Sequence, residues 1–395
     1  MRPGSVLMRE MLASSFDLSF EADLMYGDER VLERLSVVFP SIVSDSSAQV
    51  ETSGRLSVIW VADDGGSIAP VDAGDVLAPF GARIVLYVVV SSGVSSERQK
   101  VGDFDITEVP SVAGEPYVWG STVVRSGERV DLVFKDRMVE VLRDRLTGLQ
   151  QPSQLASVYA ELAALTGLPL TRTIPDAPIT RSVVYEESRV DAVQDLAALL
   201  GGVAFMEWDG TLSVRPTGAG IPVAELVLGV EVTIVQVGSS LTSEGVFNGV
   251  VIRGETANQE EILAELWVTG GPLRATLPGG IRTPFHRVPR FYSSPFISTR
   301  EQAQNAAPGL LEQFSTPRAT TLEVTCVTDP LLQVGDVVTV RDGRFVWVVR
   351  LTRVPLQQSA LMTVTGDVLS RDLFDVKVPA GFGEGVYGGP PGYGA

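Results

Sequence analysis

The chain contains almost none of the residues that build disulfides, zinc sites and most nucleophilic active sites. Its 395 residues include one cysteine, Cys326, and one histidine, His286. A lone cysteine cannot close a disulfide within the chain, and zinc sites need several Cys or His ligands. The sequence therefore excludes disulfide scaffolds and zinc enzymes, and it indicates no cofactor. Cys326 lies in the alternating run TLEVTCVTD, where we expect a small buried core residue.

Positive charge and long apolar runs are also scarce. There are 31 Lys and Arg residues against 48 Asp and Glu, a formal net charge of −17. A protein that grips nucleic acid needs clustered cations, so we expect no specific nucleic-acid binding. The longest apolar run, Ile84–Val90, falls far short of the ~20 residues that span a bilayer, so we expect no membrane segment. The first residues lack the apolar core of a signal peptide, which predicts that the protein is made and folded in a cytoplasm.

Catalytic motifs are missing as well. The sequence has no H-E-x-x-H, C-x-x-C or G-x-S-x-G motif, and no serine motif accompanies His286. Neighbouring carboxylates have structural explanations, because Asp63-Asp64, Asp209-Gly210 and Asp342-Gly343 are typical of turns and Glu186-Glu187 flanks a helix start. The sequence thus indicates a protein that is not an enzyme. A glycosidase with paired carboxylates stays open as an alternative.

Strand-like alternation, punctuated by Gly, Ser and Asp, is what the sequence has in abundance. Residues 53–64 and 82–90 are typical strands. Residues 129–146 begin as a strand and pass into a short helix with Met138, Val139 and Leu142 turned inward. Such a pattern favours a barrel or sandwich, and the chain as a whole is expected to be α+β and mainly β.

Two helices are predicted between residues 151 and 200. The first has apolar residues at helical spacing from Leu155 to Leu165, with Ser153 as its N-cap and Gly167 as its end. The second starts at Ser188, with Asp191 three residues on, and carries an inner stripe of Val193, Leu196, Ala197 and Leu200. Gly201 and Gly202 follow this helix, so they are expected to cap its C-terminus and not to cradle a phosphate.

A β-hairpin is predicted next, turning at Asp209-Gly210. A two-residue turn pairs Trp208 with Thr211 and Met206 with Ser213. Met206 and Trp208 then point away from the preceding helix, and they are candidate interface residues. Trp208 is covered either by another domain of the same chain or by another subunit.

A long Pro- and Gly-rich loop over residues 268–298 carries the second set of candidate interface residues. Arginines and aromatics alternate there without lysines or acids, which is typical of the core of a protein–protein contact: Phe285, Arg287, Arg290, Phe291, Tyr292 and Phe296. The alternative is a loop wrapped on its own domain. Pro308-Gly309 is expected to kink or split the helix that follows.

Four segments are expected from these patterns. Residues 1–148 form an N-terminal β-barrel, 149–220 a small helix–hairpin α+β domain, and 221–370 a second β-barrel with its flanking helix. Residues 371–395 form a flexible Gly/Pro-rich tail.

The order of these elements resembles that of a known family. SGRLSVIWVADDGGSIAP, DVLAPFGARIVLYVVV, VGDFDITEV and VDLVFKDRMVEVLRDRL resemble the N-terminal barrel of minor tail proteins from long-tailed phages of actinobacteria. VDAVQDLAALLGGVAFMEWDGTLSVRP resembles the helix–hairpin unit of tail-hub (baseplate-hub, tail-associated) proteins. FNGVVIRGE, STREQAQNAAPGLLEQF and LLQVGDVVTV resemble the second hub barrel with its flanking helix.

This resemblance implies a structural protein of the virion, at the tail tip. It implies a homotrimeric ring in which two barrels per subunit give pseudo-sixfold symmetry. Such a ring joins the hexameric tail tube or distal tail protein to threefold tip proteins, contacts the C-terminus of the tape measure protein, and lets DNA pass. An acidic lumen would keep the DNA from sticking.

Two other functions remain as alternatives to the hub. One is a cell-wall hydrolase of the tail tip that uses paired carboxylates. The other is a carbohydrate- or receptor-binding module with Trp119, Trp208 or Tyr292 as stacking platforms.

Overall fold

A computed structural model gives the fold of most of the chain. It describes residues 1–61, 67–119, 122–179, 183–218, 220–228, 233–256, 259–271, 273–277, 279–293, 297, 299–315 and 320–373. The expected turn at Asp63-Asp64, the candidate residue Phe296 and the tail beyond residue 373 lie outside these ranges. The chain is mainly β, as predicted, with a large and mostly antiparallel sheet of twelve strands.

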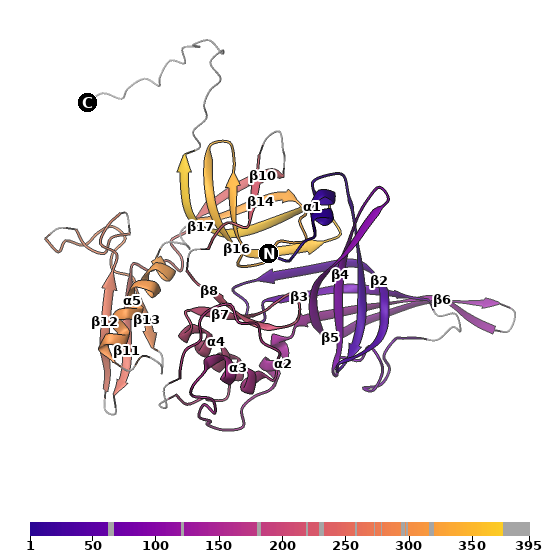
Figure 1. The fold of residues 1–395 in the computed structure, drawn as a ribbon, viewed down its shortest axis with the longest axis horizontal. Helices are drawn as coiled ribbons and strands as arrows, with labels where there is room; N and C mark the ends of the chain where they lie inside the picture. Colours follow the sequence, from indigo (N-terminus) through magenta and orange to yellow (C-terminus); the bar gives the residue numbers. More distant parts are fainter. Residues whose placement is uncertain are drawn as a thin grey trace, which may run out of the picture.

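Six strands near the N-terminus pair in a closed ring. β1 pairs with both β4 and β2, so the order β1-β4-β5-β6-β3-β2 returns to its start. Side chains alternate along each strand, and those facing inward, such as Ile84, Leu86 and Phe134, are fully buried. The six strands, shown in indigo to magenta in Figure 1, are β1 (Asp17–Tyr26), β2 (Glu29–Asp45), β3 (Thr52–Trp60), β4 (Ala82–Ser92), β5 (Ser95–Trp119) and β6 (Thr122–Asp136).

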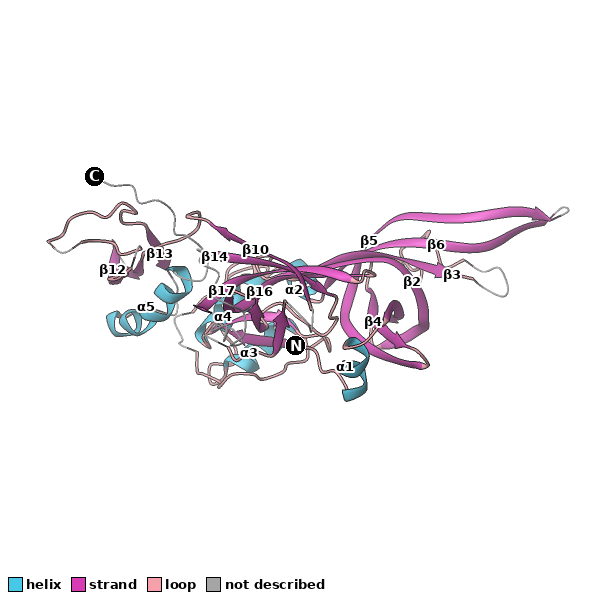
Figure 2. Cartoon of the chain, turned by 90° about the horizontal axis from the view of Figure 1, so that it is seen from above, coloured by secondary structure: helices cyan, strands magenta, loops and turns pink. Residues whose placement is uncertain are grey.

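β5 and β6 run on beyond this ring as a two-stranded arm. β4 follows β5 only as far as Asp105, and β3 follows β6 only as far as Glu128. Past these points the two strands pair with each other up to Trp119 and Thr122. The arm projects far from the rest of the chain in both views (Figures 1 and 2).

Six further strands form a second unit. Their order is β9-β15-β16-β17-β14-β10, and all neighbours are antiparallel except β9 and β15. Cys326 is fully buried in its core, as the alternation predicts. The strands are β9 (Ala224–Val227), β10 (Ile234–Leu241), β14 (Thr320–Val327), β15 (Val337–Arg341), β16 (Phe345–Gln357) and β17 (Leu361–Leu373).

Strand β2 joins the two units. Its C-terminal part, Ser41–Asp45, pairs with Arg353–Gln357 of β16, while Ser41–Ser44 also pair with β3 on the other side. A bulge at Phe39, whose φ is +50°, lets the strand bend between the two units. The two six-stranded units are therefore one continuous sheet.

The helix–hairpin unit packs beneath the junction of these two units (Figure 1). Ser188 caps its last helix by accepting a hydrogen bond from the Asp191 amide, as predicted. The predicted N-cap Ser153 is wrong, because Ser153 donates to Glu161 and the helix starts four residues later, after Ser157. The unit contains α2 (Met138–Arg143), α3 (Val158–Thr166), α4 (Arg189–Leu199), β7 (Gly202–Met206) and β8 (Leu212–Pro216).

The two glycines after α4 have different roles. Gly201 has a φ of +76° and ends the helix, as expected. Gly202 is the first residue of β7, and a Cβ there would lie 2.5 Å from the Val214 side chain and 2.6 Å from the Arg215 carbonyl oxygen. The prediction that both are caps is wrong for Gly202, which instead lets two strands approach closely.

The predicted register of the hairpin is wrong by one residue. Met206 pairs with Leu212 and Phe205 with Ser213. The turn is longer than two residues, since the Glu207 amide donates to the Thr211 carbonyl and Gly210 has a φ of +91°. A slip of one residue moves every side chain to the other face of a hairpin. Met206 therefore packs against the helices, and Phe205 faces away from them.

A separate three-stranded sheet with one helix interrupts the second unit between β10 and β14. Val250, Ile252 and Ala303 form its own small core. The helix continues through Pro308, which lies on its exposed face, so the expected split does not occur. This module, at the left of Figure 1, contains β11 (Gly249–Thr256), β12 (Gln259–Trp267), β13 (Pro289–Ser293) and α5 (Arg300–Ser315).

The N-terminal residues fasten the two halves of the large sheet. The buried guanidinium of Arg2 donates to the carbonyls of Val101 in β5 and of Pro330 and Leu332 in the second unit, at 2.8 to 3.2 Å. Burial lowers the Arg2 pKa to about 10, so the group stays charged at neutral pH. The next residues lead into α1 (Val6–Leu12), whose Met8 and Met11 pack on Leu331 and Val90.

We predict that Arg2→Ala lowers the free energy of unfolding by about 3 kcal/mol, because buried carbonyls from both units lose their donor. Denaturant unfolding of the purified chain measures the change. Arg9→Ala, which removes an exposed arginine from α1, serves as the matched control and should change stability by less than about 0.5 kcal/mol. Equal effects of the two variants would contradict the proposed fastening role.

Candidate functional site

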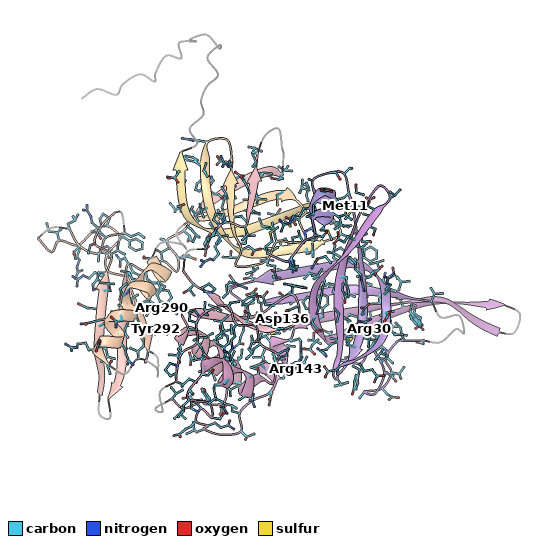
Figure 3. The ribbon with its side chains drawn as sticks, in the orientation of Figure 1. Met11, Arg30, Asp136, Arg143, Arg290 and Tyr292 are labelled. Carbon is cyan, nitrogen blue, oxygen red and sulfur yellow. The ribbon has the colours of Figure 1, made fainter. Side chains whose placement is uncertain are left out.

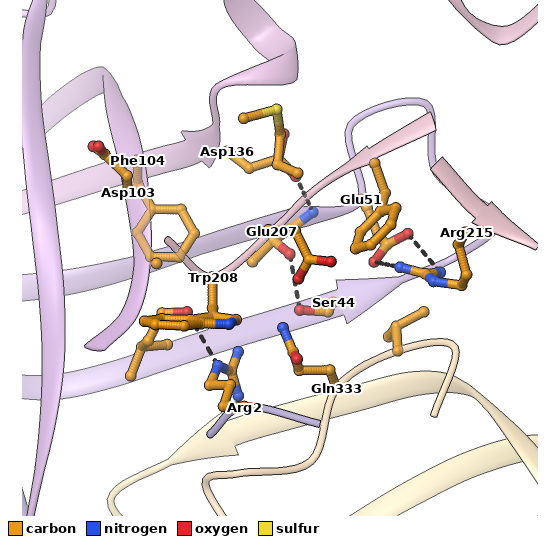
Figure 4. A pocket seen from close by; sticks show the side chains of 16 residues that line it. Arg2, Ser44, Glu51, Asp103, Phe104, Asp136, Glu207, Trp208, Arg215 and Gln333 are labelled. Carbon is orange, nitrogen blue, oxygen red and sulfur yellow. Dashed lines mark hydrogen bonds and ion pairs between the residues drawn. The ribbon is translucent and has the colours of Figure 1, made fainter. Parts of the chain in front are cut away.

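A hollow lies where the hairpin, the N-terminus and the second unit meet. It is a pocket of about 400 Å³, lined by Met1, Trp208, Arg215, Gln333 and Asp336 among others. A smaller pocket beside it reaches the first unit. Figure 4 shows Trp208 and Arg2 side by side in this second pocket. Trp208 is half-buried there, beside residues of the N-terminus and of the first unit. Its place in a subunit interface stays a prediction.

Polar contacts hold the hairpin to the large sheet around these pockets. Arg215 makes two hydrogen bonds to Glu51, at 2.9 and 3.1 Å, and lies 4.0 Å above the Phe205 ring. Lys100 of β5 donates to the Asp209 carbonyl at 2.8 Å. The pockets are therefore bordered by residues that join the three parts of the chain.

Several buried carboxyl groups lie near this junction. Asp136 accepts hydrogen bonds from the Thr52 and Met138 amides, and burial raises its pKa to about 7. Burial also raises the pKa of Glu207. Asp105 shares a hydrogen bond with Glu140, and burial together with the Glu140 charge raises the Asp105 pKa to about 7.

The arrangement of these carboxyl groups fits a structural role. Arg137 donates two hydrogen bonds to the Glu140 carboxylate, at 2.7 and 3.2 Å. Both carboxylate oxygens of Glu140 are therefore held in an ion pair where α2 meets the ring. In the parts of the chain that the structure covers, no group of three His, Cys, Asp or Glu residues could hold a metal ion. His286 lies exposed, with a φ of +61°, in the loop before β13.

The candidate interface residues fall in two distant places. Trp208 and Met206 belong to the hairpin, whereas Phe285, Arg287, Arg290, Phe291 and Tyr292 belong to the module of β11, β12, β13 and α5. Figure 3 shows Arg290 and Tyr292 in that module, well away from Asp136 at the junction. The structure therefore does not gather the candidates into one site.

Most of the module's arginines are engaged within the module itself. Arg290 lies 5.4 and 5.5 Å from the ring centres of Phe247 and Phe314, and Arg287 lies 5.3 Å from that of Trp267. These contacts favour a segment wrapped on its own unit. Part of the segment is a strand, β13, which pairs in parallel with β11. Phe291 remains 52% exposed, with Arg253 4.1 Å above its ring.

Sequence reasoning missed the aromatic partners of these arginines and the role of Arg2. Phe247, Trp267 and Phe314 lie up to 67 residues apart in the sequence. Only the fold brings Phe247 and Phe314 to Arg290, and Trp267 to Arg287. Arg2 lies next to the chain start, where no local pattern distinguishes it from an exposed arginine. The run of arginines and aromatics after residue 284 was the one available signal.

Comparison with solved structures identifies proteins of the same fold. The chain is similar to a tail protein from Neisseria meningitidis MC58, with 13% identity, a TM-score of 0.57, and 90% of this chain and 97% of that chain covered. It is also similar to the 43 kDa tail protein of prophage MuSo2 from Shewanella oneidensis, with 12% identity, a TM-score of 0.55, and 88% and 98% of the two chains covered. No protein-family model and no curated protein matches the sequence.

These likenesses show that the chain has the fold of phage tail proteins over nearly its whole described length. Among the helices that the structure describes, none is long and apolar enough to cross a membrane.

We predict that Asp105→Asn makes stability less sensitive to pH. The folded-state pKa of Asp105 is raised to about 7. The contribution of its protonated carboxyl group to folding stability is therefore complete below about pH 4 and is lost as the pH rises through 7. The asparagine stays neutral and can donate to Glu140. The difference in free energy of unfolding between the variant and the unsubstituted chain should be about 1 kcal/mol more favourable to the variant at pH 8 than at pH 5.

Denaturant unfolding at the two pH values measures this gain. Glu10→Gln, which neutralises an exposed carboxylate of α1, is the control and should show no such gain. A loss of stability of Asp105→Asn at pH 8 would contradict the assignment.

Proposed function

We propose that this chain is the hub of a phage tail tip. In this proposal three copies form a ring, and the two six-stranded units of each copy act as two barrels, so that the ring has pseudo-sixfold symmetry. The ring joins the hexameric tail tube or distal tail protein on one side to threefold tip proteins on the other. DNA passes through it during ejection.

One observation carries the proposal. Two units of six strands each are joined through β2 and β16 into one sheet, in a chain whose fold is similar to that of tail proteins. Three copies of a chain with two similar units place six similar units around a ring, which matches a tube of sixfold symmetry. The element order in the sequence, which resembles hubs of actinobacterial phages, supports the same assignment.

The proposed partners follow from this position. They are two further copies of the chain, the distal tail protein or tail tube, the C-terminus of the tape measure protein and other minor tail proteins. The net charge of −17 supports an acidic lumen that repels passing DNA. The protein is proposed to act without a catalytic site and without a cofactor, in the virion.

Labelling of intact particles tests the proposal. Antibody raised against the purified chain should mark one end of the tail, at the tip, in electron micrographs. Protein that is absent from washed particles and present only in the lysate would refute a structural role in the tail.

A cell-wall degradation assay separates the hub from the hydrolase alternative. The purified chain is expected to release no more soluble fragments than buffer does. Cleavage that disappears on changing a carboxylate to its amide would favour the hydrolase.

A further inference from the structure

The pocket of about 400 Å³ at the junction contains hydrogen-bonding groups that the fold leaves unused. Within the described part of the chain, no hydrogen bond or ion pair involves the Glu207 carboxylate, the Trp208 indole N–H or the Gln333 side-chain amide. None of their polar atoms is sealed away from solvent. Asp209 and Pro216 at the edge are exposed, so the pocket is open. A concave pocket with a few convergent polar groups is the usual form of a small-molecule site.

The Trp208 ring differs from two other tryptophan rings of the chain. Trp267 lies 5.3 Å from the guanidinium of Arg287, and Trp347 lies 5.3 Å from that of Arg371. Among the described residues, no guanidinium or second aromatic ring packs on the Trp208 indole in this way, although Trp208 is half-buried and lines the pocket. Its flat apolar surface is therefore available to a ligand.

Both walls of the pocket are held in place by hydrogen bonds. On the hairpin side, the backbone amide of Glu207 donates to the Thr211 carbonyl at 2.8 Å. On the side of the second unit, the backbone amide of Gln333 donates to the Asp336 carboxylate at 2.7 Å. Figure 4 shows Glu207, Trp208 and Gln333 around the same space. A site that is already formed loses little conformational entropy when a ligand binds.

The mixture of donors and acceptors restricts the chemistry of the ligand. The Glu207 carboxylate only accepts hydrogen bonds and the Trp208 indole only donates, whereas the Gln333 amide does both. An ammonium or guanidinium group only donates, so it would leave the indole and amide N–H groups without acceptors. An anion only accepts and would face the unpaired charge of Glu207, since Arg215 is already held by Glu51. A hydroxyl group donates and accepts, so it fits all three side chains.

We infer that this pocket binds a small neutral saccharide. Its hydroxyl groups hydrogen-bond to Glu207 and Gln333, and the apolar face of its ring packs on the Trp208 indole. The volume of about 400 Å³ lies within the range of about 300 to 1,000 Å³ that is typical of small-molecule sites. The inference goes beyond the proposed hub, because it adds a binding activity that a purely structural ring does not need.

Calorimetric titration of the full chain tests the inference, with glucose, galactose, rhamnose, N-acetylglucosamine and maltose as the probes. At least one sugar should bind with a dissociation constant in the millimolar range or below. Trp208→Ala should raise this constant roughly tenfold or more, because the ring loses its packing surface. Phe80→Ala is the matched control and should leave binding unchanged, since Phe80 is 66% exposed and lines neither pocket.

Glu207→Gln provides a second variant that preserves the shape of the pocket. Burial raises the pKa of Glu207 and thus disfavours its charged form, so the uncharged amide should not lower the melting temperature. The loss of a carboxylate acceptor should weaken sugar binding roughly tenfold. Glu10→Gln, in the exposed part of α1, should bind the sugar like the unsubstituted chain.

The inference fails if none of these sugars binds, or if both pocket variants bind as well as their controls. Binding of N-acetylarginine amide in place of the sugars, weakened by added salt, would also overturn it and show that Glu207 selects a cation. Once a sugar binds, an array of bacterial surface polysaccharides and protein-linked glycans shows which source carries it. Labelling of the particle tip depends on none of these results, so the proposed tail role is judged separately.

Discussion

The whole architecture depends on one strand that belongs to two sheets. β2 completes the closed ring through β1 and β3, and its last five residues also pair with β16 of the second unit. A strand can serve both only if it bends between them, and the bulge at Phe39 supplies the bend at the cost of a left-handed backbone in a bulky residue. Because main-chain hydrogen bonds cross the boundary, the two units cannot rotate independently.

Buried polar groups reinforce this main-chain joint from both sides. Arg2 satisfies carbonyls of both units from the N-terminal side, and Arg215 with Glu51 ties the hairpin to the sheet. Each of these groups is costly to bury alone and stabilising when its partners are in place. The junction therefore favours one arrangement of the three parts over all others, which is what a component of a symmetric assembly requires. The pockets there are a consequence of three surfaces meeting.

Local signals in the sequence predicted local structure. The cap at Ser188, the end at Gly167 and the alternation around Cys326 are each decided by residues within a few positions, and all three are confirmed. The hairpin was predicted, but its register was not, because one extra residue in the turn changes which face Met206 and Phe205 occupy.

Features created by distant contacts left no local signal. The sequence predicts a loop where β13 lies, because the strand's parallel partner β11 is about 40 residues away and Pro289 is typical of a strand break. Arg290 stands out in the sequence, but the rings beside it belong to Phe247 and Phe314, which only the fold brings near. The same limit applies to Arg2, whose three acceptors belong to residues 101, 330 and 332.

The symmetry of the assembled protein tests the central claim most directly. An averaged electron-microscopy reconstruction of the tail tip should show three copies of this chain in one ring. The two six-stranded units of each copy should alternate around it as six similar densities. Six copies in the ring, or a single copy on the axis, would contradict the account, because neither uses two joined units to adapt a sixfold tube to a threefold tip.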